Sequence, residues 1–253
     1  MSDLKDVFSK NTYVENAAEV NFEEFEKVIT SRRSVRRFTD KNIPEDVVRK
    51  CLDMALLAPN SSNLQPWEFH WVRSSKVRKK IDQAFLSQPA ATTADTIIVA
   101  VARTATWKIH AKKMVDLIKA QDPKHSALSY YEKIVPLVYT IGFLGLAGLL
   151  KKTFLSVIGF RKPVPREPTS KAELITWAVK STALACQNLM LAFRAAGYDS
   201  CPMEGMDSSR LKKLLKLPSD AVVVMGISAG QRAEDGVFGK QIRFDKKLFI
   251  HEI

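Results

Sequence analysis

The spacing of hydrophobic residues in the first half of the chain predicts two helices followed by two strands. Apolar residues recur at helical spacing over residues 21–30, and again from Pro44, which suits a first helical turn, up to Pro59, which ends the helix. The stretch QPWEFHWVR then alternates apolar and polar side chains, as a half-buried strand does. Residues 96–102, TIIVAVA, are apolar throughout and indicate a strand buried on both faces.

The second half of the chain is dominated by one long helical pattern. It runs from Lys171 to Ala196 and is closed by Gly197, a residue type common just past a helix C-terminus. Apolar residues occupy nearly every face, so we expect a central helix that is buried all round and lies near a subunit interface. A short basic helix over residues 208–215 and a buried strand over residues 221–227 follow.

The composition adds the expectation of an anionic partner. The chain has 253 residues, of which 46% are hydrophobic, enough for one large domain with a sizeable core. Its 39 basic and 27 acidic residues give a net charge of +12, which favours nucleotide phosphates, nucleic acid or an acidic membrane surface. The basic residues are scattered in small groups, with no basic tail and no aromatic–basic stripe, so we expect no nucleic-acid partner.

The cysteines and histidines indicate neither a disulfide framework nor a metal site. Cys51, Cys186 and Cys201 are odd in number and form no C-x-x-C pair, and the four histidines are not spaced as metal ligands. The first twenty residues lack the apolar core of a signal peptide. We therefore expect a protein of the reducing cytoplasm.

Familiar nucleophile and nucleotide motifs do not account for the chain. GISAG, residues 226–230, matches the nucleophile elbow G-x-S-x-G, but a turn-rich segment follows where a helix is required. We therefore assign Ser228 to the loop that leaves a strand. The sequence has no P-loop, and no G-x-G-x-x-G follows a strand, so a resident nucleotide site of either type is not expected.

Three short polar segments suit one phosphorylated, heterocyclic ligand. In RRSVR, residues 32–36, guanidinium groups can grip a phosphate bidentately, and Ser34 adds a hydroxyl. In APNSSNLQPW, residues 58–67, amides and hydroxyls between two prolines can meet a polar ring or a polyol chain. In CPMEGMD, residues 201–207, Gly205 lets the backbone approach a ligand closely. Each segment alone also fits an ordinary helix end or turn.

Taken in order, Arg-Arg-Ser, Pro-x-Ser-x-Asn-x-Gln-Pro-Trp and Pro-x-Glu-Gly resemble the motifs of the flavin-dependent nitroreductase family. The resemblance covers the chain from about Phe22 to the C-terminus, apart from residues 104–170. It implies an α+β fold in which helices sandwich a mixed sheet, assembled as an intertwined homodimer with FMN at the interface. It also implies that residues 1–253 form a single nitroreductase-like domain with a variable apolar insertion at about 104–170.

The resemblance places the charged end of FMN on the first segment and on the C-terminal region. The implied ligands of the phosphate and of the pyrimidine end of the flavin are Arg32, Arg33, Ser34 and Arg36. Two further cations near the phosphate are Lys240 and Arg243, although their spacing is one residue longer than the usual K-x-R of the family.

The resemblance places the flavin ring between the other two segments. The loop that lines the cofactor from the other subunit corresponds to Pro59, Asn60, Ser61 and Asn63. The turn over the ring, in which the Glu204 N–H would face the flavin, corresponds to Pro202, Met203, Glu204 and Gly205. Gln88 matches a polar residue that precedes the buried strand. No side chain is assigned an acid or base role, because the cofactor carries the chemistry.

The function implied by the resemblance is two-step electron transfer from NADH or NADPH through FMN to a small-molecule acceptor. That acceptor would be electron-poor and apolar, such as a nitroaromatic, a quinone or an activated alkene. The nicotinamide would visit the site only transiently, so no resident nucleotide motif is required. The alternatives are a specialised dehalogenase or dehydrogenase of the same fold, and a basic, non-catalytic protein that binds a membrane surface.

The apolar insertion allows several interpretations. Residues 134–150, IVPLVYTIGFLGLAGLL, carry no charge, and lysines flank them on both sides. As one helix the run would be ~25 Å long at ~1.5 Å per residue, shorter than a ~30 Å hydrocarbon core. The insertion therefore fits a substrate lid, a buried interface helix, an apolar hairpin that meets an anionic membrane through residues 134–162, or a transmembrane span.

Overall fold

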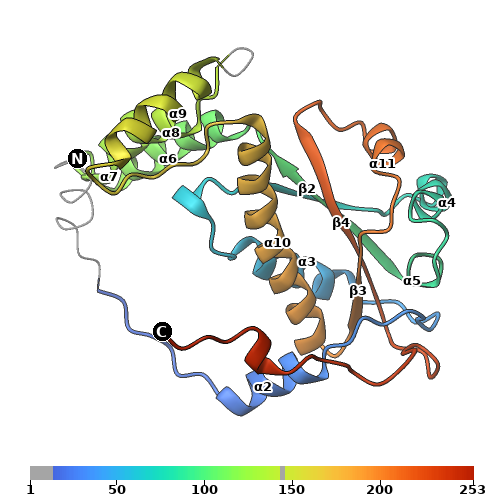
Figure 1. Ribbon diagram of the computed structural model, residues 1–253. Coiled ribbons are helices and arrows are strands. Elements are labelled where there is room, and N and C mark those ends of the chain that lie inside the picture. The colour runs from blue at the N-terminus through green and yellow to red at the C-terminus, as the bar shows by residue number, and fades with distance from the viewer. Residues whose placement is uncertain (1–13, 143–145) are drawn as a thin grey trace.

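The computed structural model describes residues 14–142 and 146–253, and its main body is a four-stranded sheet between two layers of helices (Figure 1). The strand order is β1-β2-β4-β3, with the bounds Trp67–Trp71, Thr96–Arg103, Ala221–Gly230 and Asp199–Met203 in that order. All neighbouring strands pair antiparallel, so the four-stranded sheet is antiparallel rather than mixed as expected; outside it, a single isolated parallel bridge joins Ser34 to Ser200. The expected α+β class is confirmed.

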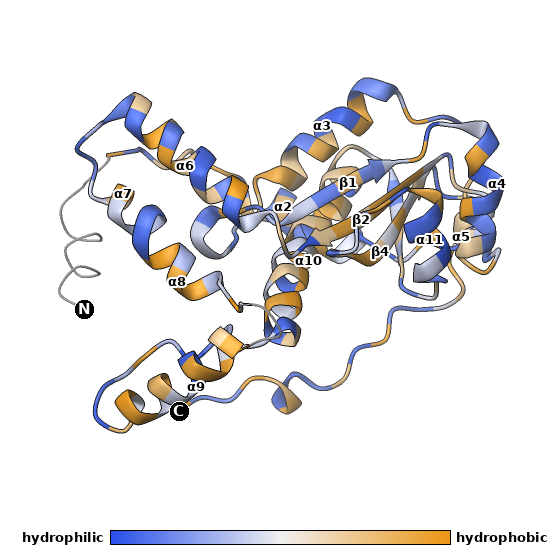
Figure 2. Ribbon diagram, turned by 90° about the horizontal axis from the view of Figure 1, so that it is seen from above, coloured by the Kyte–Doolittle hydropathy of each residue, from blue (hydrophilic) through white to orange (hydrophobic). Residues whose placement is uncertain are grey.

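Helices cover both faces of the sheet (Figure 2). One face carries α3 (Glu45–Leu56) and α10 (Lys171–Ala195), and the other carries α4 (Ser75–Ala84), α5 (Pro89–Thr92) and α11 (Ser208–Leu214). The side chains of β2 alternate accordingly, because successive residues of a strand point to opposite faces. Ile97 and Val99 pack on the side of α4, whereas Ile98 and Ala100 pack on the side of α10.

The long helix α10 is central, as the sequence predicted, but it is not buried all round in this chain, because one face carrying Thr176, Lys180 and Leu184 is exposed. It begins after Ser170, whose Oγ accepts from the Glu173 N–H at 3.2 Å, which is the usual N-cap bond. It ends before Gly197, whose φ of +87° is unstrained only without a Cβ. Eleven of its side chains are buried, so packing on several sides stabilises it more than helix propensity does.

The described residues of the insertion, 104–142 and 146–170, form a second lobe of helices beside the N-terminal end of α10 (Figure 1). Its elements are α6 (Trp107–Gln121), α7 (Ala127–Ser129), η2 (Tyr130–Ile134), α8 (Val135–Tyr139) and α9 (Leu146–Gly159). The lobe is joined to α10 by aromatic packing: the ring of Tyr139 lies 4.6 Å from Trp177 and 6.0 Å from Trp107 between centroids.

The apolar run 134–150 is not one helix. The helix α8 ends at Tyr139, Gly142 adopts a φ of +77°, and a separate helix begins at Leu146. Within residues 14–142 and 146–253, no helix combines the length and the apolar character needed to cross a bilayer. Among these residues the structure therefore contains no helix of the kind that the transmembrane interpretation of the insertion requires.

Two segments at the chain ends expose their apolar side chains. The helix α2 (Phe22–Ser31) forms where predicted, but none of its residues is buried, and Phe22 is 73% exposed. The C-terminal residues 238–253 are exposed throughout and contain one short turn, η4 (Lys246–Leu248). Because isolated apolar stripes of this size are costly in water, both segments are surfaces suited to a partner.

The strand β4 extends three residues beyond its predicted end at Ile227. Ser228 therefore lies inside the strand rather than in an exit loop, and that prediction is wrong. Its side chain is fully buried, and its hydroxyl donates to the Cys201 carbonyl at 3.3 Å. A nucleophile elbow needs an exposed turn, so GISAG is a structural segment of the sheet.

Candidate functional site

The arginine-rich segment runs along the edge of the sheet beside β3. The Val35 N–H donates to the Ser200 carbonyl at 3.1 Å, and the Arg36 N–H donates to the Gly236 carbonyl at 2.7 Å. The backbone of this segment is thereby held between β3 and the chain that follows β4. Val35 is fully buried, so the segment is anchored by one apolar side chain while its neighbours carry the charges.

A cavity of about 270 Å³ lies between this segment and residues 237–243. We call it the arginine cavity. Its lining contains Ser34 and no acidic residue, and its cations are Arg32, Arg33, Arg36, Lys240 and Arg243. The structure thus brings together, in one chain, the residues that the sequence assigned to a phosphate. Guanidinium and ammonium groups without acidic neighbours create a strongly positive site for an anion.

Unpaired polar atoms support this assignment. Among the described residues, Arg32 Nη1 and Ser200 Oγ are buried and have no hydrogen-bond partner. Buried polar atoms are nearly always paired, so an unpaired guanidinium nitrogen marks the place of an acceptor. The positive charge of this segment also acts on β3. Burial raises the pKa of the Cys201 thiol in that strand, whereas the charges of Arg36 and Arg32 favour the thiolate and so tend to lower this pKa.

Gln88 connects the arginine cavity to the turn after β3. Its Oε1 accepts from Arg36 Nη1 at 3.4 Å, and its Nε2 donates to the Gly205 carbonyl at 3.3 Å and to the Phe85 carbonyl at 3.2 Å. Residues from three separate parts of the sequence therefore meet at one amide. These bonds are at the long end of the N–H···O range, so the amide can exchange them for a ligand at small cost.

The turn after β3 presents open backbone. Met203 is buried at the end of the strand and Pro202 is half-buried, whereas Glu204 and Gly205 are exposed. A Cβ at Gly205 would meet only Leu86 Cδ1, at 4.0 Å, so a flat ligand can approach the backbone here.

The negative charge of Glu204 acts on a buried thiol of α10. Burial raises the pKa of the Cys186 thiol to about 12, and the negative charge of Glu204 acts in the same direction. The turn after β3 and the central helix are therefore coupled electrostatically.

The loop over residues 58–66 is attached to the insertion lobe. Ser61 Oγ lies 3.1 Å from the Tyr139 hydroxyl, and Ser62 Oγ lies 2.6 Å from the Tyr130 hydroxyl. Inside the loop, Asn60 Oδ1 accepts from the Gln65 N–H at 2.7 Å. The loop is thus held in one shape by its own amide and by tyrosines that lie about 70 to 80 positions later.

This loop does not belong to the arginine cavity of its own chain. In the described parts of the chain, no hydrogen bond or shared cavity connects Pro59, Asn60, Ser61 or Asn63 to it. The expectation that these residues line the cofactor of another subunit stays a prediction.

Several site residues were not identified from the sequence. Ser200, with its unpaired hydroxyl, is a polar residue inside a buried strand, and that contrast was the available signal. Tyr130, Tyr131 and Tyr139 stand within ten residues of an otherwise apolar segment, a clustering that could have indicated a polar contact. Their partners lie far away along the chain, so the sequence did not indicate which residues they would meet.

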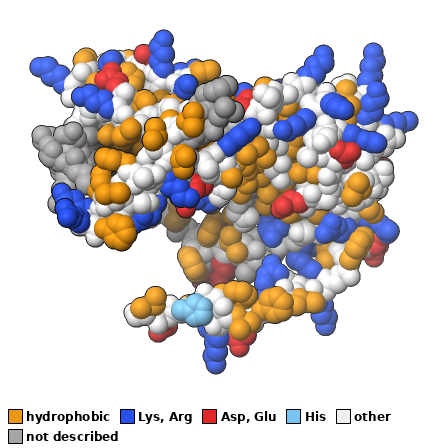
Figure 3. All heavy atoms as spheres, turned by 45° about the horizontal axis from the view of Figure 1, so that its top comes forward, with side chains coloured by type: hydrophobic (Ala, Val, Ile, Leu, Met, Phe, Trp, Pro, Cys, Tyr) orange, Lys and Arg blue, Asp and Glu red, His pale blue; other side chains and the backbone are white. Residues whose placement is uncertain are grey.

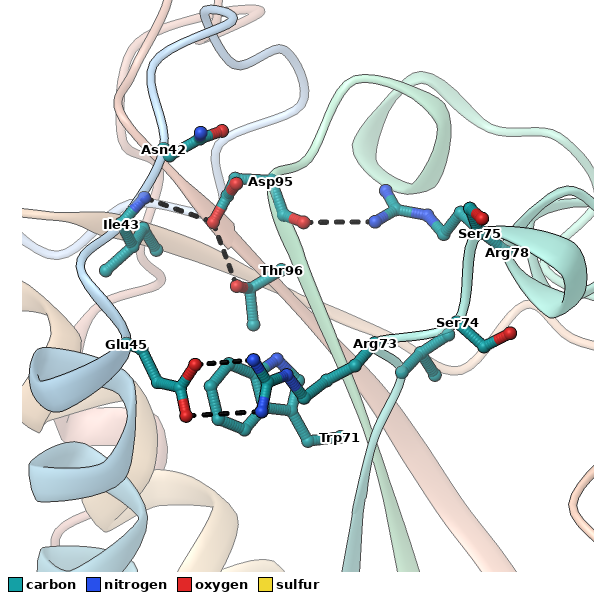
Figure 4. A pocket seen from close by; sticks show the side chains of 11 residues that line it. Asn42, Ile43, Glu45, Trp71, Arg73, Ser74, Ser75, Arg78, Asp95 and Thr96 are labelled. Atoms are coloured by element: carbon teal, nitrogen blue, oxygen red, sulfur yellow. Dashed lines mark hydrogen bonds and ion pairs between the residues drawn. The ribbon is translucent and has the colours of Figure 1, made fainter.

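A second cavity, of about 420 Å³, lies between the start of α3 and the end of β1 (Figure 4). Its charged groups already pair with one another: Glu45 meets Arg73 at 2.5 Å, and Arg73 lies over the Trp71 ring at 4.9 Å. The Asp95 carboxylate accepts from the Ile43 N–H at 3.1 Å and from the Thr96 hydroxyl at 3.0 Å. Because these charges are neutralised internally, this cavity is less suited to an anionic ligand than the arginine cavity.

The structure is thus an α+β protein with a cavity lined by cations at the edge of its sheet. The family model described as the nitroreductase family matches residues 29–231, which is most of the chain. The chain therefore belongs to the nitroreductase family. Membership makes it an oxidoreductase of a family whose proteins use FMN.

Individual relatives agree with this assignment. Protein DrgA of Synechocystis sp. is 30% identical over 208 residues, which cover 82% of this chain and 83% of that protein. The NADH dehydrogenase of Thermus thermophilus is 27% identical over 205 residues, covering 81% of this chain and 85% of that one. A protein of Exiguobacterium sibiricum, crystallised with FMN, shares the fold with a TM-score of 0.66 at 20% identity, covering 95% of this chain and 100% of that chain.

Proposed function

We propose that this chain is a homodimeric, FMN-dependent oxidoreductase that takes electrons from NADH or NADPH. Its acceptor is an electron-poor, apolar organic molecule such as a nitroaromatic, a quinone or an activated alkene. The observation that carries the proposal is the arginine cavity, which is free of acidic residues and contains an unpaired Arg32 nitrogen, in a chain of the nitroreductase family. When bound, FMN supplies the two-electron chemistry.

The arginine cavity fits the phosphate of FMN. Guanidinium groups bind phosphate through paired, charge-assisted hydrogen bonds, and a buried nitrogen without a partner gains the most from such a ligand. The residues that would hold the phosphate and the adjoining end of the cofactor are Arg32, Arg33, Ser34, Arg36, Lys240 and Arg243. Their charges would also favour any negative charge that develops on the bound cofactor.

The flavin ring would lie over the turn after β3. The residues that would meet it are Gln88, Pro202, Met203, Glu204 and Gly205. The arginine cavity of one chain, about 270 Å³, is smaller than the ~300–1,000 Å³ of usual ligand sites, so one chain forms only part of the site. The remaining wall would come from a second copy, through its Pro59, Asn60, Ser61 and Asn63.

The insertion would form the wall of the acceptor site. In this proposal, residues 1–253 are a single nitroreductase-like domain, and residues 104–170 are its variable apolar insertion. Tyr130 and Tyr139 of the insertion hold Ser62 and Ser61 of the loop that would line the cofactor. The lobe is therefore positioned beside the cofactor loop, where apolar side chains favour an apolar acceptor.

The visible absorption spectrum of the purified protein tests the proposal. We expect bands of oxidised flavin after reconstitution with FMN, bleaching of these bands by NADH or NADPH without oxygen, and their return on addition of an electron-poor acceptor. Addition of nitroaromatics, quinones and activated alkenes one at a time identifies the acceptor class. A well-folded protein that takes up no FMN contradicts the proposal.

A further inference from the structure

The outer face of α9 is a continuous apolar stripe. Its side chains are 62–73% exposed, and they are Leu146, Leu149, Leu150, Phe154 and Val157. At 100° per residue these positions fall on one side of the helix. Figure 2 shows α9 as mainly hydrophobic, and Figure 3 shows hydrophobic side chains gathered on the lobe that carries it. We call these five side chains the α9 stripe.

The polar groups beside the α9 stripe are satisfied within the helix. The Thr153 hydroxyl donates to the Leu149 carbonyl at 3.1 Å, and the Ser156 hydroxyl donates to the Lys152 carbonyl at 2.8 Å. Unpaired hydroxyls are costly in an apolar medium, whereas paired ones are tolerated. This face can therefore enter hydrocarbon without leaving a polar side chain unpaired.

The charge of the surrounding segment has one sign. Between Lys133 and Arg166 the sequence contains no Asp or Glu, whereas the rest of the chain carries 27 acidic residues. The basic residues of this segment are Lys133, Lys151, Lys152, Arg161, Lys162 and Arg166. Anionic lipid attracts such clusters with about 1 kcal/mol per basic residue near the surface, and each acidic residue would oppose that attraction.

We propose that α9 docks on the surface of an anionic bilayer, with the α9 stripe among the outer acyl chains and its basic neighbours at the headgroups. A helix of 14 residues is ~21 Å long, too short to span but suited to lie in the plane of the interface. The exposed apolar segments suited to a second copy, α2 and residues 238–253, lie at the opposite end of the molecule from α9 (Figure 1). A dimer that forms through these two segments alone would leave the α9 stripe uncovered.

An apolar cavity between α8 and α9 is a competing site for lipid. It measures about 450 Å³ and is lined by Leu137, Val138, Phe154, Leu155 and Ile158 among others. On its wall, Lys151 Nζ donates to the Val138 carbonyl at 2.6 Å. Leu150 and Val157 are outside this lining, so variants of these two residues separate docking through the stripe from uptake into the cavity.

Co-sedimentation with vesicles tests the proposal. We expect the wild type to bind mixed phosphatidylcholine–phosphatidylglycerol vesicles, to bind less as salt rises, and to bind pure phosphatidylcholine vesicles weakly. The double variant Leu150→Asp/Val157→Asp should lose about tenfold or more in affinity, because each buried aliphatic side chain contributes about one order of magnitude. The matched control is Ile109→Asp/Leu117→Asp on α6, where both side chains are 60% exposed; it should bind like the wild type apart from a small charge effect.

A charge variant gives a second, independent test. Lys152→Gln/Arg161→Gln removes two exposed cations, and it should lower affinity for the mixed vesicles by about 30-fold with little effect on folding. Thermal unfolding of every variant checks that the fold is intact.

Three outcomes would overturn the proposal. The first is a wild type that does not bind the mixed vesicles. The second is vesicle binding that survives in the stripe variant but is lost in Leu155→Ala, which would assign lipid to the cavity. The third is a stripe variant that turns a dimeric wild type into a monomer in light scattering, which would assign the stripe to a second copy. None of these measurements depends on FMN.

Discussion

At the scale of single residues, the most informative side chain is Arg32. It is half-buried, and its Nη1 has no partner in the described parts of the chain. Its neighbour along the segment, Arg37, is different: it pairs with Asp235 and lies over the Phe238 ring at 5.7 Å. Arg32, which lines the arginine cavity, therefore has a buried donor without a partner, whereas Arg37 is paired on the surface.

Replacing Arg32 should affect ligand binding much more than folding. We expect Arg32→Ala to weaken FMN binding by about 10- to 100-fold, since hydrogen bonds to charged groups contribute about 1.5–3 kcal/mol each. The free energy of unfolding of the ligand-free protein should change by less than about 1 kcal/mol. Flavin fluorescence titration and urea unfolding measure the two quantities. Arg37→Ala is the control, and equal FMN affinity in both variants would contradict the assignment.

The buried thiols should make the protein less stable in alkali. Burial raises the pKa of Cys51 from the ordinary 9.0 to about 11. The unfolded chain therefore ionises first, so stability is full below about pH 9 and falls as the pH rises toward the folded pKa. The free energy of unfolding of the wild type should fall between about pH 8 and pH 11. In Cys51→Ala this fall should be smaller by about 1–2 kcal/mol. Urea unfolding at both pH values checks this, and parallel losses would refute it.

At the scale of elements, a charged network joins the ends of β1, β2 and β4. Arg103 at the end of β2 donates to both oxygens of Asp220 at 3.0 Å, and it also pairs with Glu68 of β1. The Ala105 N–H donates to the same Asp220 carboxylate at 3.1 Å. Burial alone would raise the pKa of Asp220, but the hydrogen bonds from Arg103 and Ala105 outweigh it, and the pKa is lowered.

Neutralising Asp220 should destabilise the sheet. Asp220→Asn leaves Arg103 only partly paired. We expect it to lower the free energy of unfolding by about 1–3 kcal/mol at neutral pH. Because the folded pKa is depressed, this stability is present above the ordinary value of 3.8 and disappears as the pH falls through the folded pKa. The difference between variant and wild type should therefore shrink in acid.

The control for this experiment is an exposed ion pair. Asp235 pairs with Arg37 on the surface, where both side chains are about half exposed, so Asp235→Asn should cost less than about 0.5 kcal/mol. Urea unfolding across the acid range measures both variants. A constant difference for Asp220→Asn at every pH would show that the carboxylate charge is not the cause.

At the scale of the whole molecule, α2 and the C-terminal segment are two of the regions that expose apolar side chains. Phe244 and Phe249 of the C-terminal segment are 76% and 66% exposed, with ring centroids 6.5 Å apart. Phe22 of α2 is similarly exposed at the other end of the sequence. Lys240 and Arg243 of the arginine cavity belong to the same C-terminal segment. A second copy that buried this segment would therefore also fix two of the cations proposed to bind FMN, so dimerisation and FMN binding would be coupled.

Removing exposed aromatic side chains from the C-terminal segment should therefore reduce both dimerisation and FMN occupancy. We expect Phe244→Ser/Phe249→Ser to shift a dimeric wild type toward monomer and to lower its bound flavin at the same protein concentration, because each aromatic side chain contributes about 1.5–3 kcal/mol on burial. Light scattering and flavin absorbance measure the two effects. Leu117→Ser on α6 is the control, and a wild-type monomer that holds FMN would contradict the expectation.

Local patterns account for most of the elements. Periodicity gave the helix over residues 171–196, its end at Gly197 and the strands around residues 67–71 and 96–102, because these features depend on neighbours a few positions away. The same patterns did not predict that the apolar face of α2 is exposed. They also did not predict that β4 continues through Ser228. Whether an apolar stripe is covered depends on distant chain segments.

The sequence by itself determined the types of most elements in the main body, the basic character of the chain and a set of residues expected to hold a phosphate. Only the tertiary structure decided which of these residues meet. Arg33 donates to the carbonyl of Gly239, 206 positions later, and Gln88 joins Arg36 to Gly205. Helix and strand periods act over a few residues, whereas a binding cavity depends on packing between segments that are distant along the chain.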